Sequence, residues 1–293
     1  MDHSFVLDAL TSGDWTEMGT IPRASNDTRL LVLEHAGRAL KAVYKPIVGE
    51  RPLHDFPPAS LALREVASFR LSAALDLGVV PATVLRDDLP AGRGSLQAYV
   101  EASEDEEAVT LSTVNAIPAD HTPIFALRTE DGRDLVLSHA VTESLRAIAF
   151  FDLLANNADR KAGHVITGSC LPSTAAEDIG TFGIDNGLTF HPQEKLRTVL
   201  WGFSRTSFRA EELDALDEVA RMDDELVSTL ADCLTDAELE ALADRAETLI
   251  TGEFFPEAPD DRTVIPWPPI GLISCAASPT RMRRAVQRRA ARR

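Results

Sequence analysis

Four charged side chains, widely separated in the sequence, are of the types needed to move a charged group. Lys45 ends an apolar run in "AVYKP", and Glu65 lies in "LREVAS", where apolar residues recur at helical spacing. Asp159 comes after two asparagines in "NNADRKAGHVI", and Asp185 stands in "GIDNG". A lysine can hold phosphate oxygens, one carboxylate can accept a hydroxyl proton, and a second can bind a divalent metal ion. The set therefore predicts phosphoryl transfer.

Each of these residues also has an ordinary explanation. Lys45 could be a solvated charge at a strand end, and Glu65 an exposed helix residue. Asp159 and Asp185 could be turn residues, since Asp, Asn and Gly are common turn formers. Their order favours the functional interpretation: strand lysine, helix glutamate, loop aspartate and a second aspartate after a hairpin follow the protein-kinase plan.

The elements that would position Lys45 and Glu65 follow from hydrophobic patterning. Residues 15–45 predict strands, with two apolar runs around the turn-forming "HAGR". Residues 59–77 predict a helix that ends at Gly78. "VVPATVLRDD" and "GSLQAYVEAS" predict two further strands joined by "LPAGRG".

The two aspartates fall in the second half of the chain. The acidic segment "EASEDEEAVTLSTVNAIPADHTP" is expected to be a mobile connector, and a helix is expected from Leu137 to Asn157. The runs "HVIT" and "TFGID" predict a small hairpin between Asp159 and Asp185.

Beyond "LRTVLWGF" the pattern becomes mainly helical. "TDAE" predicts a helix start, with Thr235 as the cap and Glu238 three residues later. The proline-rich "PEAPDDRTVIPWPPI" predicts an irregular strap.

These elements predict an α+β protein with the two lobes of a protein-kinase-like fold. A β-rich nucleotide-binding lobe with one helix would span residues 1–105, and a larger, mainly helical catalytic lobe residues 106–270. Residues 271–293 would form a disordered arginine-rich tail.

The composition excludes several classes of protein. The chain of 293 residues has no apolar run near the roughly 20 residues of a membrane span. Its start lacks a signal-peptide pattern, and its three cysteines form no close pair, so a cytoplasmic location is expected. Removing the seven arginines of "TRMRRAVQRRAARR" from the net charge of −17 leaves −24, so nucleic-acid binding by the folded body is not expected. The tail itself could contact an anionic membrane weakly, bind nucleic acid or fold back on the acidic body.

Several motifs carry a family resemblance. "NNADRKAGHVI" resembles the catalytic loop of the phosphatidylinositol 3-/4-kinase superfamily, with type II phosphatidylinositol 4-kinases nearest (N-T-D-R-G-x-D-N). "GIDNGLTFH" is similar to their metal-binding I-D-N-G-L-A-F, "VYKP" to F-K-P, "LGVVPAT" to G-V-V-P-K-T and "GSLQAYVE" to G-S-F-Q-L-F-V-E. A bacterial family of kinase-like proteins resembles the chain from its first strands to "WPPI".

The resemblance implies a role for each matching residue. Lys45 would contact the ATP phosphates with Glu65 as its partner, Asp159 would be the catalytic aspartate and Asp185 a metal ligand. The adenine-binding hinge would include Gln97, Tyr99 and Val100. The loop "RASNDT" would cover the phosphates through Ser25, Asn26 and Thr28, although the loop could equally be an ordinary hairpin turn.

One residue departs from the superfamily pattern. Five residues after the catalytic aspartate the superfamily has a metal-binding asparagine, and this chain has His164. Mg²⁺ prefers hard oxygen ligands, whereas imidazole suits Mn²⁺ and later transition metals better. His164 could ligate a softer metal, could hydrogen-bond a phosphate or Asp185, could mark the loss of the second metal site, or could simply pack at a strand start.

The expected function is that of an ATP-dependent kinase using Mg²⁺ or Mn²⁺. It would transfer the γ-phosphoryl group of ATP to a hydroxyl of an unidentified protein, lipid or small molecule. The alternatives are a non-catalytic nucleotide-binding regulator (a pseudokinase), which His164 motivates, and an adenylyltransferase on the same fold.

Overall fold

The computed structural model describes residues 3–21, 26–103, 108–129, 131–171 and 178–271. The helices of this part of the chain are α1 (His3–Ser12), α2 (Leu61–Ala74), α3 (Glu143–Ala155), α4 (Ala210–Arg221), α5 (Asp224–Leu230) and α6 (Asp236–Gly252). The strands are β1 (Asp14–Thr20), β2 (Arg29–His35), β3 (Arg38–Pro46), β4 (Thr83–Arg86), β5 (Gly94–Ala98), β6 (Glu101–Ala102), β7 (Val109–Ser112), β8 (His121–Arg128), β9 (Asp134–Ala140), β10 (Val165–Ser169) and β11 (Gly180–Gly183).

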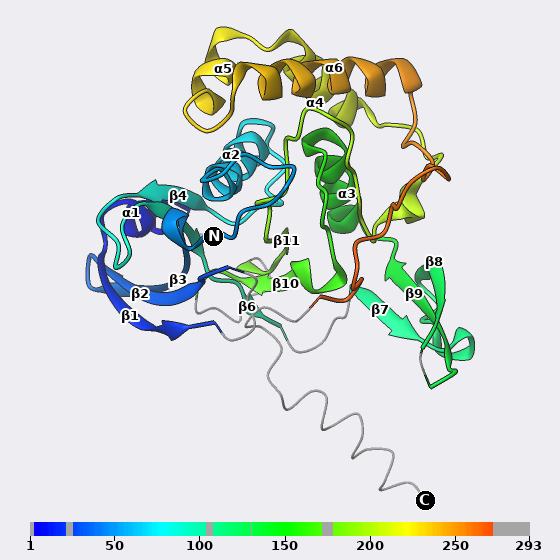
Figure 1. Ribbon diagram of the computed structural model, residues 1–293, viewed down its shortest axis with the longest axis horizontal. Coiled ribbons are helices and arrows are strands. Elements are labelled where there is room, and N and C mark those ends of the chain that lie inside the picture. The colour runs from blue at the N-terminus through cyan, green and yellow to red at the C-terminus, as the bar shows by residue number, and fades with distance from the viewer. Residues whose placement is uncertain (1–2, 22–25, 104–107, 130, 172–177, 272–293) are drawn as a thin grey trace, which may run out of the picture.

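The N-terminal lobe is built on a five-stranded antiparallel sheet in the order β1-β2-β3-β5-β4. The predicted "HAGR" turn joins β2 to β3, with both Ala36 and Gly37 at positive φ, as a tight two-residue hairpin requires. The alternating apolar residues of these strands are buried, and α1 adds its own apolar face to the same core. In Figure 1, α2 lies between this sheet and the helices of the other lobe.

A two-residue link joins the lobes. Strand β5 belongs to the large sheet, whereas β6 pairs with β10 in a second, three-stranded sheet of order β11-β10-β6. Only Tyr99 and Val100 lie between these strands. A Cβ at Gly168 would stand 2.0 Å from the carbonyl oxygen of Glu101, so only glycine allows β6 to pair there.

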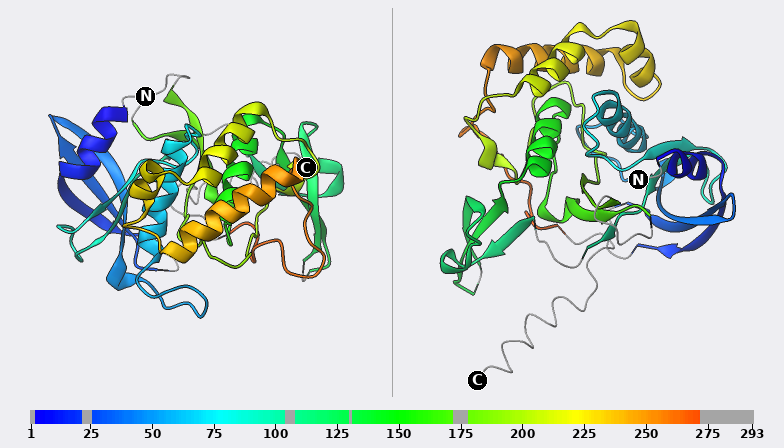
Figure 2. Two further views of the ribbon diagram at one scale, coloured as in Figure 1. Left: turned by 90° about the horizontal axis from the view of Figure 1, so that it is seen from above. Right: turned by 180° about the vertical axis from the view of Figure 1, so that it is seen from behind.

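The C-terminal lobe has α3 at the centre of its core, and α4 packs against α6 (Figure 2). The predicted start of α6 is confirmed, because Glu238 Oε2 accepts the backbone N–H of Thr235 at 2.8 Å in a capping box. The strap over residues 256–271 is irregular, as predicted. It is held by backbone contacts, including those from Ala162 N to Pro269 O (2.9 Å) and Gly163 N to Ile270 O (3.1 Å).

Two expected boundaries were wrong, and both errors concern a third sheet of order β7-β9-β8. The expected connector contains β7 and the start of β8, whose residues gain their hydrogen bonds from β9 rather than from neighbours in sequence. The helix expected from Leu137 begins only at Glu143, because residues up to Ala140 form the central strand β9. Thr142 caps the helix, and its side chain accepts the N–H of Leu145.

The expected α+β class and two-lobed, kinase-like fold are confirmed (Figure 1). The division near residue 105 stays a prediction, and the arginine-rich tail lies outside the described residues. None of the described helices combines the length and the apolar character that crossing a bilayer requires.

Candidate active site

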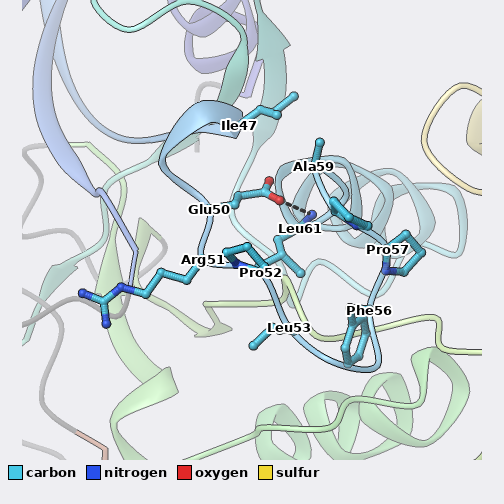
Figure 3. Close-up of a pocket in the computed structure, with 10 residues that line it drawn as sticks. Ile47, Glu50, Arg51, Pro52, Leu53, Phe56, Pro57, Ala59 and Leu61 are labelled. Carbon is cyan, nitrogen blue, oxygen red and sulfur yellow. Dashed lines mark hydrogen bonds between the residues drawn. The ribbon is translucent and has the colours of Figure 1, made fainter.

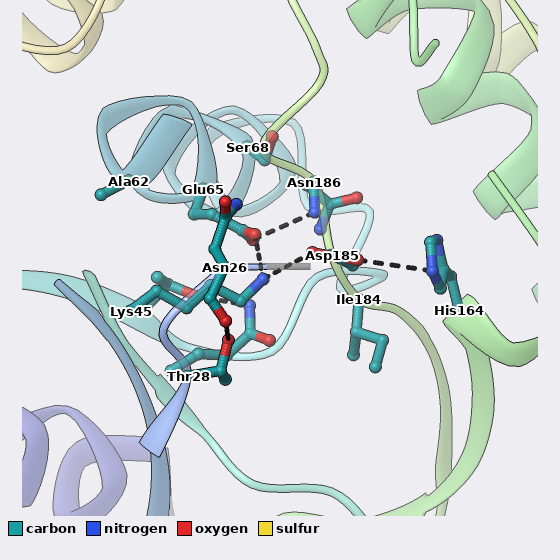
Figure 4. Close-up of polar contacts among 12 residues, drawn as sticks. Asn26, Thr28, Lys45, Ala62, Glu65, Ser68, His164, Ile184, Asp185 and Asn186 are labelled. Atoms are coloured by element: carbon teal, nitrogen blue, oxygen red, sulfur yellow. Dashed lines mark hydrogen bonds and ion pairs between the residues drawn. The ribbon is translucent and has the colours of Figure 1, made fainter. Parts of the chain in front are cut away.

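Lys45, at the end of β3, joins three elements that are distant in sequence. Its Nζ forms an ion pair with Glu65 of α2 and lies 2.7 Å from Oδ1 of Asp185, just after β11 (Figure 4). Burial disfavours the charged ammonium, but the two carboxylates outweigh this effect and raise the pKa of Lys45. Lys45 therefore stays positively charged between the lobes.

Glu65 connects this ammonium to the backbone of the C-terminal lobe. Its side chain is buried, and Oε2 accepts the N–H of Asn186 at 3.0 Å while Oε1 faces Lys45. One carboxylate thus fixes both the lysine and the segment that carries Asp185. Neither oxygen of Glu65 lacks a partner.

Asp185 presents its carboxylate in a left-handed backbone conformation, with φ of 58°. Asp and Asn tolerate this conformation better than most residues, which suits the "IDNG" sequence. Lys45 lowers the pKa of Asp185 against the opposing effect of burial. The side chain is 51% exposed, so a ligand can reach the ionised carboxylate.

Asp159 lies in the loop after α3, where the two asparagines set the backbone. Asn156 ends α3 in the left-handed conformation, and Oδ1 of Asn157 accepts the N–H of Asp159 at 2.9 Å. Burial raises the pKa of Asp159, while Lys161, whose Nζ lies 2.7 Å from Oδ2, opposes the rise. Asp159 is thereby a stronger base than an exposed aspartate.

The Arg160 side chain links the Asp159 loop to the segment that carries Asp185. It is fully buried and pairs with Asp152 of α3, with Nη2 2.9 Å from Oδ1. It also donates to the carbonyl of Ile184 at 2.7 Å and to Oδ1 of Asn186 at 2.6 Å. A Cβ at Gly183 would stand 2.8 Å from this guanidinium, so the close approach depends on glycine.

His164 points at Asp185 from the other side of the loop (Figure 4). Its Nε2 lies 3.4 Å from Oδ2 of Asp185, and the imidazole is buried. Burial lowers the pKa of His164 to about 4, and Asp185 only partly offsets this effect. The ring is therefore neutral at pH 7.

The predicted phosphate-covering loop is described only in part, because Ser25 lies outside the described residues. The backbone carbonyl of Asn26 accepts from the hydroxyl of Thr28 at 3.2 Å, and Oδ1 of Asn26 accepts from the N–H of Arg51 at 2.9 Å. In Figure 4, Asn26 and Thr28 are drawn on the same side of the site as Lys45.

The predicted hinge residues lie at the link between the lobes. Tyr99 and Val100 form that link, and the N–H of Tyr99 donates to the carbonyl of Lys41 at 3.0 Å. Gln97 lies on β5, but its side-chain amide donates to Thr83 at 2.9 Å. Adenine contact by these residues stays a prediction.

A separate hollow lies beside the β3–α2 loop (Figure 3). Glu50, at its edge, accepts the N–H groups of Leu61 and Ala62 and so caps the start of α2. Phe56 and Leu61 line the hollow and also pack against Ala158, the residue before Asp159. The hollow thus adjoins the loop without containing its charged groups.

The residues present fit a divalent metal ion that shares its ligands with a nucleotide. Among the described residues no three His, Cys, Asp or Glu side chains converge, so a metal held by the protein alone is not indicated. Mg²⁺ in nucleotide sites is usually bound through one or two carboxylates together with phosphate oxygens and water. Asp185 Oδ2, which Lys45 does not engage, and the neutral ring of His164 could supply the protein ligands.

The sequence predicted one site that contains Lys45, Glu65, Asp159, His164 and Asp185. It did not predict the residues that hold these side chains in place. Lys161 contacts Asp159, and Asn186 is held by both Glu65 and Arg160. The signals were present in "ADRKAGH" and "IDNG", where charged and amide side chains adjoin the aspartates. The partnership of Arg160 with Asp152 had no signal, because Asp152 lies within an apolar helix.

No family model matches the chain. Among solved structures, the chain is similar to the crystal structure of a Helicobacter pylori proinflammatory kinase, CtkA, with a TM-score of 0.40 and 12% identity. The match covers 84% of this chain and 94% of the kinase, and at that TM-score it is too distant to argue from. Among curated proteins, Protein Rv2133c of Mycobacterium tuberculosis is 38% identical over 270 residues, which are 88% of this chain and 93% of the relative. The chain belongs to the same protein family as Protein Rv2133c.

Proposed function

We propose that this protein is an ATP-dependent phosphotransferase that moves the γ-phosphoryl group of ATP to an acceptor hydroxyl. The observation that carries the proposal is the meeting of Lys45 from β3, Glu65 from α2 and Asp185 after β11 at one ammonium. Phosphoryl transfer needs mainly positioning and charge neutralisation, and this arrangement supplies both.

Lys45 and Glu65 would act on the phosphates as a unit. Glu65 orients the ammonium from a buried position and is itself held by the N–H of Asn186. Because Glu65 is fixed, the Lys45 side chain would lose little conformational entropy when its ammonium moves from Asp185 to a phosphate oxygen.

Asp159 would receive the proton of the acceptor. The hydroxyl oxygen attacks the γ-phosphorus, an O–P bond forms, and the bond to the β–γ bridging oxygen breaks to release ADP. The hydroxyl proton passes to the Asp159 carboxylate, whose raised pKa suits it to this role. Lys161, 2.7 Å from that carboxylate, is placed to hold negative charge on the transferred group.

Asp185 and His164 are the residues that would hold a divalent ion. The ion, Mg²⁺ or Mn²⁺, would neutralise phosphate charge when it is bound. Arg160 keeps the Asp185 segment in register with the Asp159 loop through Ile184 and Asn186. The proposed base, Asp159, and the proposed metal ligand, Asp185, are therefore held by one hydrogen-bond network.

The test is transfer of label from ATP by the full chain. We expect label from [γ-³²P]ATP to reach an acceptor or water, with either Mg²⁺ or Mn²⁺, and to be lost in Asp159→Ala and Asp185→Ala. Asp87→Asn, on an exposed loop, is the matched control and should retain transfer. Thermal shift with ATP on each variant separates loss of binding from loss of chemistry.

The other outcomes distinguish the alternatives. Transfer of α-label would indicate adenylylation and contradict the proposal. Stabilisation by ATP without any transfer would instead support a non-catalytic regulator. Absence of nucleotide binding in both metals would exclude all three functions.

A further inference from the structure

Two buried histidines in this protein are held in opposite ways. His139 of β9 is fully buried, its Nδ1 is 2.7 Å from the carbonyl oxygen of Ala140, and its Nε2 accepts the N–H of Gly202 at 3.1 Å. Its ring also stacks on Phe203. Each ring nitrogen thus has a partner, as is normal for buried polar groups.

His164 lacks such hydrogen-bond partners although only 7% of the residue is exposed. Its Nδ1 has no hydrogen-bond partner among the described residues. Its Nε2 lies 3.4 Å from Oδ2 of Asp185, beyond the range of an N–H···O hydrogen bond. The ring is therefore buried with neither nitrogen well paired, and a ligand at Nε2 would supply one of the two missing partners.

The backbone fixes this ring in place. The N–H of His164 donates to the carbonyl of Lys161 at 3.0 Å, and its carbonyl accepts from the N–H of Ile184 at 2.9 Å. The second bond ties His164 to the residue before Asp185. The imidazole and the carboxylate therefore face each other because two strand ends are joined, not because the side chains bind each other.

The distance between them suits two ligands of one ion. Ligands bound at about 2.1 Å stand roughly 3.0 Å apart at right angles and roughly 3.4 Å apart at the tetrahedral angle. Lys45 engages Oδ1 of Asp185, which leaves Oδ2 facing the histidine. The charged groups around the ring are Asp185, Arg160, Lys161 and Lys45.

We propose that His164 Nε2 and Asp185 Oδ2 together bind a divalent cation of the first transition series, so that the site prefers Mn²⁺ to Mg²⁺. The proposal rests on the proposed function for the nucleotide that completes the coordination, and it adds the class of metal. An imidazole ligand favours ions that accept nitrogen, whereas Mg²⁺ demands oxygen. The remaining nitrogen, Nδ1, carries the ring proton in this state.

The test measures metal binding directly on the full chain. Free Mn²⁺ is followed by electron paramagnetic resonance during titration, with Mg²⁺ as competitor, both without nucleotide and with a non-hydrolysable ATP analogue. We expect Mn²⁺ to bind at least about tenfold more tightly than Mg²⁺. Loss of an outer-shell partner costs roughly 10- to 100-fold in metal affinity, so loss of a ligand should cost at least about tenfold.

Three variants isolate the histidine. His164→Asn offers an amide oxygen in place of the ring nitrogen and should reduce the preference for Mn²⁺ to near equality while Mg²⁺ binding persists. Asp185→Asn should weaken both metals. His54→Asn, on an exposed loop, is the matched control and should bind as the unmodified chain does.

A spectroscopic signature decides which atom binds. Electron spin echo modulation of bound Mn²⁺ should show coupling to an imidazole nitrogen that is absent in His164→Asn. An unchanged Mn²⁺ to Mg²⁺ ratio in that variant, or bound Mn²⁺ without nitrogen coupling, would overturn the proposal. It would also be overturned if neither metal bound to a chain that a melting curve shows to be folded.

These outcomes are separate from those of the proposed function. Nitrogen-coupled Mn²⁺ without label transfer would leave the metal site standing and remove the kinase activity. Label transfer in Mg²⁺ alone, with no nitrogen coupling, would do the reverse.

Discussion

Adjacent residues of α2 enter two buried ion pairs with opposite surroundings. Arg64 faces the C-terminal lobe and pairs with Glu238 of α6, and the two side chains are 1% and 5% exposed. Its Nε also donates to the carbonyl of Thr189 at 2.8 Å. Glu65 pairs with Lys45 of the N-terminal lobe, whose second carboxylate partner, Asp185, is half exposed.

The two ion pairs differ in whether their charges are satisfied entirely within the protein. All charge in the Arg64 pair is satisfied within the protein, since Glu238 also caps the start of α6. In the Lys45 group, the charge extends to a carboxylate that a ligand can reach. Burial of an ion pair alone therefore does not indicate a site; a buried charge linked to an accessible one does.

The strongest test of this comparison is Arg64→Met. Removing one partner leaves the Glu238 carboxylate buried, so the free energy of unfolding should fall by about 3–5 kcal/mol. Urea denaturation followed by circular dichroism measures this change. The protein that remains folded should keep its nucleotide affinity.

A double variant checks the cause. Arg64→Met combined with Glu238→Leu removes both charges, and it should recover much of the lost stability. If the double variant were less stable than the single one, the pair would be supporting the fold through packing or the α6 cap.

The corresponding change on the other face is Lys45→Met. We expect phosphoryl transfer to fall by roughly 10²- to 10³-fold, because a preorganised charge opposite the phosphates is lost. The measurement is label transfer at saturating ATP. A variant with normal transfer would show that Lys45, like Arg64, is only structural.

A smaller effect should follow from Lys161→Met, which leaves both faces of α2 intact. Lys161 lowers the pKa of Asp159 against the rise caused by burial, so its removal should raise that pKa further. Because Asp159 must be ionised to accept a proton, the acid limb of the pH–rate profile should move to higher pH. A shift to lower pH, or no shift, would contradict the assignment of Asp159 as base.

The smallest effect is expected at a third ion pair of α2, between Arg70 and Asp232. The two side chains are 31% and 57% exposed, and Arg70 also donates to the carbonyl of Thr229 at 2.9 Å. Asp232→Asn should therefore change the free energy of unfolding by less than about 1 kcal/mol and leave transfer unaffected. A larger loss of unfolding free energy would mean that solvent exposure does not determine how much each of these ion pairs contributes to stability.

The sequence allowed prediction of the features that depend on local patterns. The β2–β3 hairpin, α2 and the α6 cap each have a period, a turn or a capping signal within a few residues. The chain order of Lys45, Glu65, Asp159 and Asp185 indicated the candidate site because it follows the protein-kinase plan. The structure brings Lys45, Glu65 and Asp185 into direct contact and places Asp159 in the neighbouring loop.

The features that could not be predicted depend on contacts between distant segments. Leu137 resembled a helix residue, but its segment pairs with β7 and β8 on both sides. Arg160 looked like one more loop charge, and its complete burial follows from Asp152, Asn186 and a close glycine. Neither the partner strands nor the charge pair has a local signature.

The strap has a consequence for the order in which the protein can mature during synthesis. The N–H groups of Ala162 and Gly163, beside Asp159, find their acceptors at Pro269 and Ile270, more than a hundred residues later. At translation rates of about 5–20 residues per second, the ribosome needs roughly 5–20 s to reach those acceptors after making the loop. A nascent chain that has already folded its N-terminal lobe therefore still has an unfinished Asp159 loop, which is completed only after Pro269 and Ile270 have been made.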